Sequence, residues 1–181
     1  MMKKSLSIGS IALFCTLAGC ASINNTAPQA IAPMNPTQGH QVSGTVTFTQ
    51  VEGGVRVDAH LTGLIPGPHG FHIHEKGDCS APDASSAGAH FNPTKHKHGN
   101  PGQGEHHLGD MPALVADDQG NAHLSATLAG LTLTEGETAV VGHSVIVHAD
   151  PDDYMTQPTG NSGARISCGI ISANHPLSSE K

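Results

Sequence analysis

The sequence predicts an all-β fold, an antiparallel β-sandwich or flattened barrel of seven or eight short strands with two long functional loops. Composition is the first reason. The 181 residues include 22 glycines and 12 prolines but only 3% aromatic residues, which favours short strands joined by loops. Pattern is the second reason, because apolar and polar residues alternate over several short segments and two long stretches show no periodicity.

The predicted strands follow one another along the chain. Val42, Val46 and Phe48 alternate with polar residues, and a turn at residues 52–54 leads to a second strand at residues 55–61. The remaining strands are predicted at residues 70–75, 113–116, 122–128, 142–148 and 165–171.

The two aperiodic stretches are residues 76–111 and 149–164. Unstructured loops of such length are uncommon in a compact domain unless they have a function. A metal ion or a disulfide can order backbone that buries little apolar surface, so we expect these loops to carry the functional site.

The N-terminus has the pattern of an export signal. Lys3 and Lys4 precede a short apolar run that ends in Leu-Ala-Gly-Cys at residues 17–20, which resembles the bacterial lipoprotein cleavage box. We therefore expect a signal peptide at residues 1–19 and lipidation of Cys20; an ordinary secretory signal is the alternative. Ala21 in place of aspartate indicates outer-membrane attachment, so we expect a lipid-anchored protein on the periplasmic side of the cell envelope.

The polar, proline-containing residues 20–39 are predicted to be a flexible tether. The folded domain is then expected to span residues 40–175, followed by a tail at residues 176–181.

Export places the chain in an oxidising compartment, where cysteines pair. Of the four cysteines, Cys15 leaves with the signal and Cys20 carries lipid. Cys79 and Cys168 remain, and neither lies in the Cys-x-x-Cys arrangement of many metal sites. We predict a disulfide between them that ties the first long loop to the last strand.

Charge excludes one class of partner. The formal net charge is −7, Lys and Arg together number only 8, and they form no basic stripe. We therefore expect no nucleic-acid binding.

The 14 histidines indicate metal binding. In Gly-Phe-His-Ile-His-Glu at residues 70–75, His72 and His74 point to the same face of a strand while Ile73 packs into the opposite side. Two such imidazoles can bind one ion. Further potential ligands are spread along the chain as a binuclear site requires: His90, His98, His107, Asp110 and His148.

Five motifs together resemble copper/zinc superoxide dismutase over roughly residues 41–172. They are the motif at residues 70–75, His-Phe-Asn-Pro at 90–93, His-x8-His-x-x-Asp at 98–110, Val-His at 147–148 and Gly-x-Arg-x-x-Cys-Gly at 163–169. The resemblance implies an eight-stranded Greek-key barrel, copper and zinc as cofactors, and superoxide as substrate.

The resemblance also implies the ligands. The copper ligands would be His72, His74, His90 and His148, and the zinc ligands His90, His98, His107 and Asp110. His90 belongs to both sets and would bridge the two ions. Imidazole nitrogen suits both oxidation states of copper, and three nitrogens with one carboxylate suit a closed tetrahedral zinc site.

Neighbouring histidines compete for two of these positions. His96 is an alternative to His98, and His106 is an alternative to His107. The spacing of the family motif favours His98 and His107.

Other histidines are expected to have no metal. His69 matches a buried structural histidine of the family, and His143 falls on the opposite strand face from His148. His40, His123 and His175 are expected at the surface.

Two residues complete the implied site. Asp152 matches an aspartate that links a copper ligand to a zinc ligand, here His72 to His98, although a solvated loop carboxylate is the alternative. Arg165 matches the arginine that docks a small anion.

The implied mechanism is a two-step cycle. One superoxide reduces Cu(II) and leaves as oxygen; a second reoxidises Cu(I), receives protons from His90 and water, and leaves as hydrogen peroxide. His90 and Arg165 are therefore the expected catalytic residues.

Some features depart from the family pattern or stay open. The loop at residues 149–164 contains no lysine to steer superoxide, so Lys95 or Lys97 are candidates for that role. The resemblance leaves a homodimer open.

Three rival functions are copper storage or delivery, zinc-dependent hydrolysis and a purely structural lipoprotein. We favour a dismutase that protects the cell envelope, for three reasons. His90 is expected to bridge the metals, Arg165 is expected to dock an anion, and all four zinc ligands would come from the protein, which leaves no open position for hydrolysis.

Overall fold

The computed structural model describes residues 27–174, which form ten β-strands and one 3-10 turn, η1 (Ser85–Ala87). No α-helix occurs among these residues, so the all-β prediction is confirmed. The strands are β1 (Gln29–Pro36), β2 (Ser43–Val51), β3 (Gly54–Thr62), β4 (Gly67–His69), β5 (Phe71–His74), β6 (Leu114–Ala116), β7 (Ala122–Ala129), β8 (Ser144–His148), β9 (Arg165–Ile170) and β10 (Ser172–Ala173).

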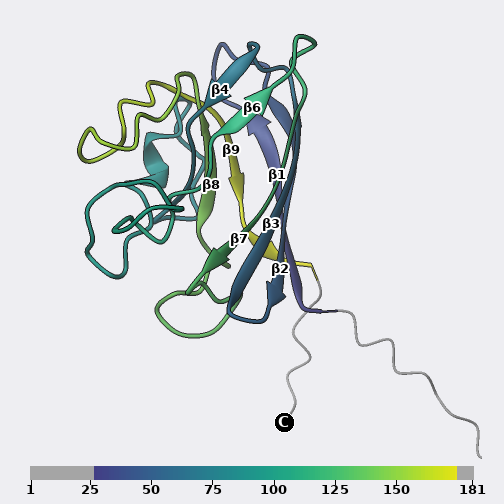
Figure 1. Ribbon diagram of the computed structural model, residues 1–181. Coiled ribbons are helices and arrows are strands. Elements are labelled where there is room, and N and C mark those ends of the chain that lie inside the picture. Colours follow the sequence, from purple (N-terminus) through teal and green to yellow (C-terminus); the bar gives the residue numbers. More distant parts are fainter. Residues whose placement is uncertain (1–26, 175–181) are drawn as a thin grey trace, which may run out of the picture.

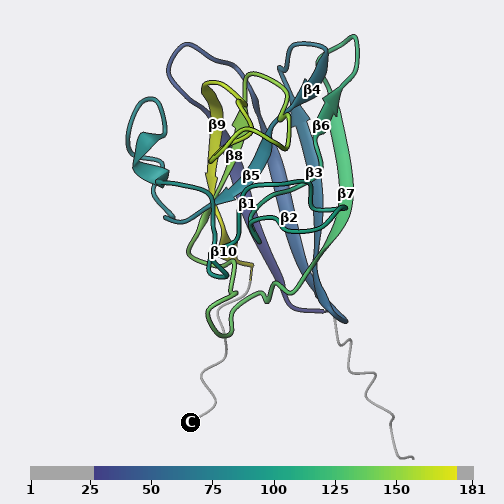
Figure 2. The same cartoon turned by 60° about the vertical axis from the view of Figure 1, so that its left-hand side comes forward.

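The strands form one antiparallel sheet in the order β4-β6-β7-β3-β2-β1-β9-β8-β5, with β10 paired to β1. Strands β4 and β5 stand at opposite ends of this order, yet only Gly70 separates them in the chain. The sheet must therefore curl until its two edges meet, which makes a flattened, nearly closed barrel (Figures 1 and 2). Connections such as β3 to β4 pass over intervening strands, as in a Greek key.

Strand β1 lies inside the predicted tether at residues 20–39. The folded domain therefore begins before the predicted start at residue 40. Residues 29–34 pair with β2, and residues 35–36 pair with β9. Ala30, Ala32 and Met34 alternate inward and are buried, a period of two that the prolines obscured. Pro33 has no N–H to donate. On the side of β1 that faces β9 and β10, it lies between the two paired segments, so no strand on that side needs the missing donor.

The barrel interior is a continuous apolar core. The alternate residues of β2, β3 and β8 that the pattern points inward are buried there, including Val46, Phe48 and Val145. Phe71 and Ile73 of β5 are also fully buried in this core. Their neighbours His72 and His74 must therefore lie on the outer face of the barrel.

The two long loops cover that outer face. Figure 1 shows both projecting from the same side of the barrel, the first in teal and the second in yellow-green. All five residues of β8 are buried, because the core covers one face and the loops cover the other. The Cys79–Cys168 disulfide is present and joins the first loop to β9, as predicted; it packs with Ala84, Ala87 and Ile146 in a second, smaller cluster.

Several predictions concern residues outside the described range. The signal peptide, lipidated Cys20, His175 and the tail at residues 176–181 all lie there. Within residues 27–174 we find no helix of the length and apolarity that a membrane crossing requires.

Candidate metal centre

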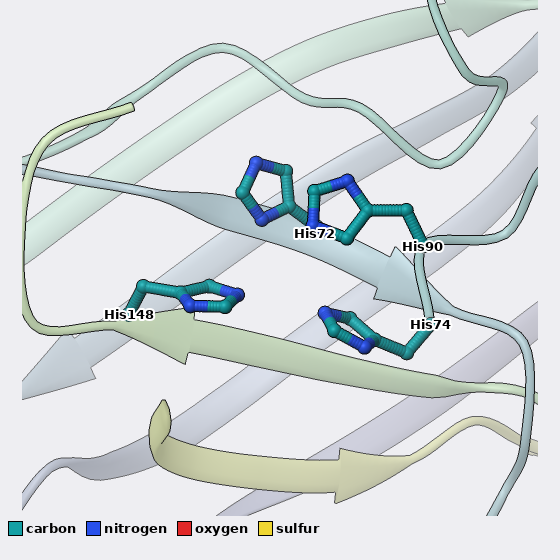
Figure 3. A group of neighbouring side chains, drawn as sticks. All are labelled: His72, His74, His90 and His148. Atoms are coloured by element: carbon teal, nitrogen blue, oxygen red, sulfur yellow. The ribbon is translucent and has the colours of Figure 1, made fainter. Parts of the chain in front are cut away.

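Two groups of buried ligand side chains meet beneath the long loops. The first consists of His72 and His74 on β5, His148 at the end of β8 and His90 from the first loop. One ring nitrogen from each lies within 4.8 Å of the others. Figure 3 shows the four rings turned toward a common space from three different segments of the chain.

The inner nitrogens of this group have no hydrogen-bond partner. Four buried ring nitrogens of this group have no hydrogen-bond partner: Nδ1 of His72 and Nε2 of His74, His90 and His148. Burying an unpaired polar atom is costly, so such atoms in one place call for an explanation. Metal coordination supplies it, because each nitrogen offers a lone pair to an ion.

The outer nitrogens of the same rings are held by acceptors. His74 Nδ1 lies 3.0 Å from the Gly88 carbonyl oxygen, and His148 Nδ1 lies 3.3 Å from that of Gly163. His72 Nε2 lies 2.6 Å from Asp152 Oδ2. A ring that donates its outer N–H presents its inner nitrogen unprotonated, which is the usual arrangement around a metal. This donor set fits copper.

The second group gathers around one carboxylate. Asp110 Oδ1 lies 2.9 Å from His90 Nδ1, 3.1 Å from His98 Nδ1 and 3.3 Å from His107 Nδ1. Asp110 Oδ2 accepts hydrogen bonds from the backbone N–H of His107 and of Gly99. Three nitrogens and one carboxylate oxygen at such mutual distances are a donor set that fits tetrahedral zinc.

Electrostatics in the second group follow from this crowding. Burial alone would raise the pKa of Asp110, but hydrogen bonds from His107, His90 and His98 hold it far below its usual range. Burial alone would lower the pKa of His98, but Asp110 and Asp152 outweigh burial and raise it to about 9. The anionic carboxylate is thus ready to bind a cation at neutral pH.

The first group behaves in the opposite way. Burial lowers the pKa of His90 to about 4, and burial also lowers the pKa values of His72, His74 and His148. Mutual repulsion between the rings adds to this effect for His74 and His148. These imidazoles therefore stay neutral at physiological pH, which is the form that binds metal.

Asp152 joins the two groups. Its Oδ2 lies 2.6 Å from His72 Nε2 and its Oδ1 lies 2.9 Å from His98 Nε2, the two histidines that it was expected to link. It is buried, so the solvated-carboxylate alternative does not describe it. Gly160 makes room for this contact, since a Cβ there would lie 1.8 Å from Asp152 Oδ1.

Arg165 lies beside the first group, at the start of β9. Its Nη1 donates to the Ala84 carbonyl at 2.7 Å and its Nη2 donates to the Gly88 carbonyl at 2.6 Å. The Gly88 oxygen also receives His74 Nδ1, so one carbonyl positions both a candidate ligand and the arginine. Arg165 borders a polar cavity of about 390 Å³ together with Thr37, Gln38, His40 and Asp83, among others.

The alternative histidines lie outside both groups. His96 is exposed and His106 is partly exposed, whereas His98 and His107 are buried in the second group. His69 is buried, with its ring nitrogens each 2.8 Å from a backbone carbonyl oxygen, of His148 and of Ile65.

Further predicted non-ligands also lie apart. His143 contacts the Glu75 carbonyl and stacks on Phe91. His40 and His123 are exposed as predicted.

Sequence reasoning missed two supporting residues. Gln157 receives the backbone N–H of His98 on its Oε1 at 3.0 Å and returns a hydrogen bond to the His98 carbonyl, which fixes the segment that carries this histidine. Gly88 contributes a backbone carbonyl, a group that every residue type has. Residue type therefore gives no sequence signal for the role of Gly88.

The fold and these two groups define a class of protein, a β-barrel with adjacent buried donor sets for two metal ions that share one histidine. The family model for copper/zinc superoxide dismutase matches residues 42–171. A Cu-Zn superoxide dismutase of Deinococcus radiodurans is 38% identical over 174 residues, covering 90% of this chain and 93% of that protein. An extracellular Cu-Zn superoxide dismutase of Drosophila melanogaster is 42% identical over 173 residues, covering 90% and 94%.

The chain belongs to the copper/zinc superoxide dismutase family. It is an oxidoreductase that dismutes superoxide, and its cofactors are copper and zinc. The Greek-key barrel, the enzyme class, the cofactors and the substrate expected from the sequence are thereby confirmed.

Proposed function

We propose that this dismutase binds copper through the first group and zinc through the second. The copper ligands are His72, His74, His90 and His148; the zinc ligands are His90, His98, His107 and Asp110. The observation that supports this division best is the convergence of unpaired, buried ring nitrogens in the first group, next to a carboxylate that already faces three Nδ1 atoms in the second.

Copper supplies one-electron redox chemistry between Cu(II) and Cu(I). His90 supplies the proton site, since its Nε2 faces the first group and its Nδ1 faces Asp110 in the second. A ring held at Nδ1 can hold or release a proton at Nε2 without leaving its place. Asp152 keeps the rings of His72 and His98 in fixed orientation while this happens.

Arg165 binds the superoxide anion. Its guanidinium is anchored by two backbone carbonyls and borders the polar cavity, so it presents a fixed positive charge to a small anion that enters there. Thr37 and His40, from the turn after β1, also line this cavity. Lys95 and Lys97 are exposed and remain candidates for longer-range steering.

The enzyme acts outside the cytoplasm, held to the membrane by lipid on Cys20, and protects the cell envelope from superoxide. The cleavage-box pattern at residues 17–20, the disulfide and an extracellular relative support this location. A Cys20→Ser variant is expected to move from the membrane fraction to the soluble fraction, with unchanged specific activity.

A homodimer stays a prediction. Ile65, next to β4, and Val115 on β6 are 76% and 61% exposed and offer apolar surface to a second copy. Sedimentation of the protein across a concentration series tests it.

The copper assignment is tested with a pair of histidine variants on the same strand region. His148→Gln is expected to lose copper and dismutation while zinc content stays near one per chain. His143→Gln is the control and is expected to retain both. Full copper content in the His148 variant would refute the assignment.

The zinc assignment is tested in the same way by His98→Gln against His96→Gln. Zinc loss in the first and zinc retention in the second are expected, because His98 is buried in the second group whereas His96 is exposed. The reverse result would move the site to His96.

A further inference from the structure

A second cluster of imidazoles lies outside the metal centre. His60 on β3 and His123 on β7 are direct cross-strand partners, and their Nδ1 atoms are 2.7 Å apart. Their ring centroids are 4.8 Å apart with the planes inclined at 70°. Both side chains are exposed, so solvent and solutes reach them.

This pair is separated from the catalytic side of the barrel. In the sheet order, β2 and β1 lie between β3 and β9, and β8 follows β9. Figure 2 shows β3 and β7 on the right of the barrel and β8 and β9 on the left. Inward neighbours Ala59 and Ala122 are buried in the core, so His60 and His123 point to the outside of the barrel.

The two facing nitrogens allow two states. Without an ion, one Nδ1 donates a proton to the other, which must be the tautomer without a proton there. With an ion, both Nδ1 atoms offer lone pairs, and the proton that had been on Nδ1 is replaced by one taken up from solvent at Nε2 of the same ring. The second state therefore needs only a change of tautomer and small movements of two exposed side chains.

The spacing of the nitrogens is compatible with two ligands on one ion, and the chemistry of nitrogen ligands favours copper. Two nitrogens at about 2.0 Å from one ion lie about 2.8 Å apart at a right angle and about 3.3 Å apart at the tetrahedral angle. The observed 2.7 Å is close to the first value. Right angles between neighbouring ligands are the geometry of tetragonal Cu(II), and copper also ranks above zinc in affinity for nitrogen ligands.

A hydrogen-bonded carboxylate lies on the same face beside the pair. Asp58 precedes His60 by two residues and Ser125 follows His123 by two, so each shares the face of its histidine, and the two are cross-strand partners. Asp58 Oδ1 accepts from Ser125 Oγ at 2.6 Å and its Oδ2 accepts from Arg56 Nε at 2.8 Å. These bonds fix the carboxylate, and its ion pair with Arg56 offsets much of its charge, so Asp58 is a neighbour of the pair and not one of its ligands.

We propose that His60 and His123 form a surface Cu(II) site on β3 and β7, outside both donor groups of the metal centre. The site supplies two neighbouring ligand positions, and water completes the coordination. It does not depend on the assignments made above for the catalytic metals.

The copper- and zinc-loaded protein is titrated with Cu(II) and followed by calorimetry and by difference electron paramagnetic resonance. One additional Cu(II) per chain is expected, with hyperfine structure from two nitrogens. His60→Gln and His123→Gln should each weaken this binding by about tenfold or more, because each leaves a single imidazole without its chelate partner. Dismutation and the thermal unfolding midpoint should stay unchanged in both variants, since the residues are exposed and remote.

His40→Gln is the matched control, an exposed histidine without an imidazole partner among the described residues; the additional Cu(II) should remain. An additional ion that binds the His60 and His123 variants as tightly as the parent would overturn the proposal, as would the absence of any additional ion. Equal affinity for Zn(II) at the pair would overturn the choice of copper.

Discussion

Asp152 shows how much one side chain decides at the residue scale. Each of its oxygens holds one histidine, His72 in the first group and His98 in the second. Burial alone would raise its pKa, but the hydrogen bonds of His72 and His98 hold it well below its usual range, so the carboxylate stays charged. A charged acceptor fixes the tautomer of both rings, which then expose Nδ1 to the metals.

Asp152→Asn is therefore expected to reduce metal affinity. The amide can accept from only one of the two rings, because its other end is a donor. We expect zinc and copper affinities to fall by about 10- to 100-fold and activity to fall with them. Competition with a chromophoric chelator measures both affinities.

Asp153→Asn is the control for this change. Asp153 is exposed and receives the backbone N–H groups of Met155 and Thr156 on Oδ1, which an asparagine oxygen also accepts. Equal loss of metal in the two variants would show that the loop, and not the link to His72 and His98, is responsible.

At the scale of elements, the first long loop depends on its covalent anchor. The disulfide fixes Cys79 to β9, three residues beyond Arg165, across a separation of 89 residues. The same loop supplies the carbonyls of Ala84 and Gly88 that hold the arginine. The disulfide thus constrains the loop that positions Arg165, the residue proposed to bind the anion.

Replacing Cys79 and Cys168 together by alanine is expected to lower the free energy of unfolding by about 2–5 kcal/mol. It should also lower kcat/KM and flatten its dependence on ionic strength, because Arg165 loses its fixed position. Chemical unfolding and steady-state rates at several salt concentrations measure the two effects. Reduced stability with an unchanged salt dependence would refute the link to Arg165.

Strand β1 is the element that the sequence concealed. It lies between β2 and both β9 and β10, so it has two neighbours and is not an edge. Its buried residues are mainly alanines, which give a weak alternation signal, and Pro33 argues against a central strand.

A chain truncated to start at residue 40 is expected to lose cooperative unfolding, since β2 and β9 would expose unpaired backbone edges. A chain that starts at residue 27 should unfold with the same midpoint as the longer protein. Circular dichroism during heating distinguishes them, and equal midpoints for both truncations would show that β1 is dispensable.

At the scale of the whole molecule, the buried histidines couple stability to pH when the metals are removed. The pKa values of His72, His74, His90 and His148 are lowered by burial, that of His90 to about 4. The unfolded chain, with histidine pKa values of about 6.5, then binds more protons between these values. Their contribution is present above pH 6.5 and is lost as the pH falls toward 4.

His98 contributes with the opposite sign. Its pKa is raised to about 9, so its contribution is fully present below about pH 6.5 and is lost as the pH rises through 9. The metal-free protein should therefore be most stable near pH 6.5. Urea unfolding of chelated protein at pH 5, 6.5 and 9 checks this, and stability that rises steadily to pH 9 would contradict it. Adding copper and zinc should raise stability throughout, by mass action.

Residue type and spacing were enough to predict the fold class, the disulfide and the residues that gather in the two donor groups. They were enough because a period of two places His72 and His74 on one face, because only Cys79 and Cys168 were left to pair, and because each ligand motif has its own spacing. These are local properties, readable from residue type and position.

The way in which the strands, the loops and the ligand rings meet follows from the tertiary structure alone. Strand pairing places β5 beside β8, the core and the loops bury the two faces of β8, and the carbonyls of Gly88 and Gly163 orient two rings. The same holds for β1 and for the approach of His60 to His123, residues far apart in the sequence with no motif between them. Pairing across strands depends on the register of the whole sheet, and neither a carbonyl nor a register is encoded by the type of a single residue.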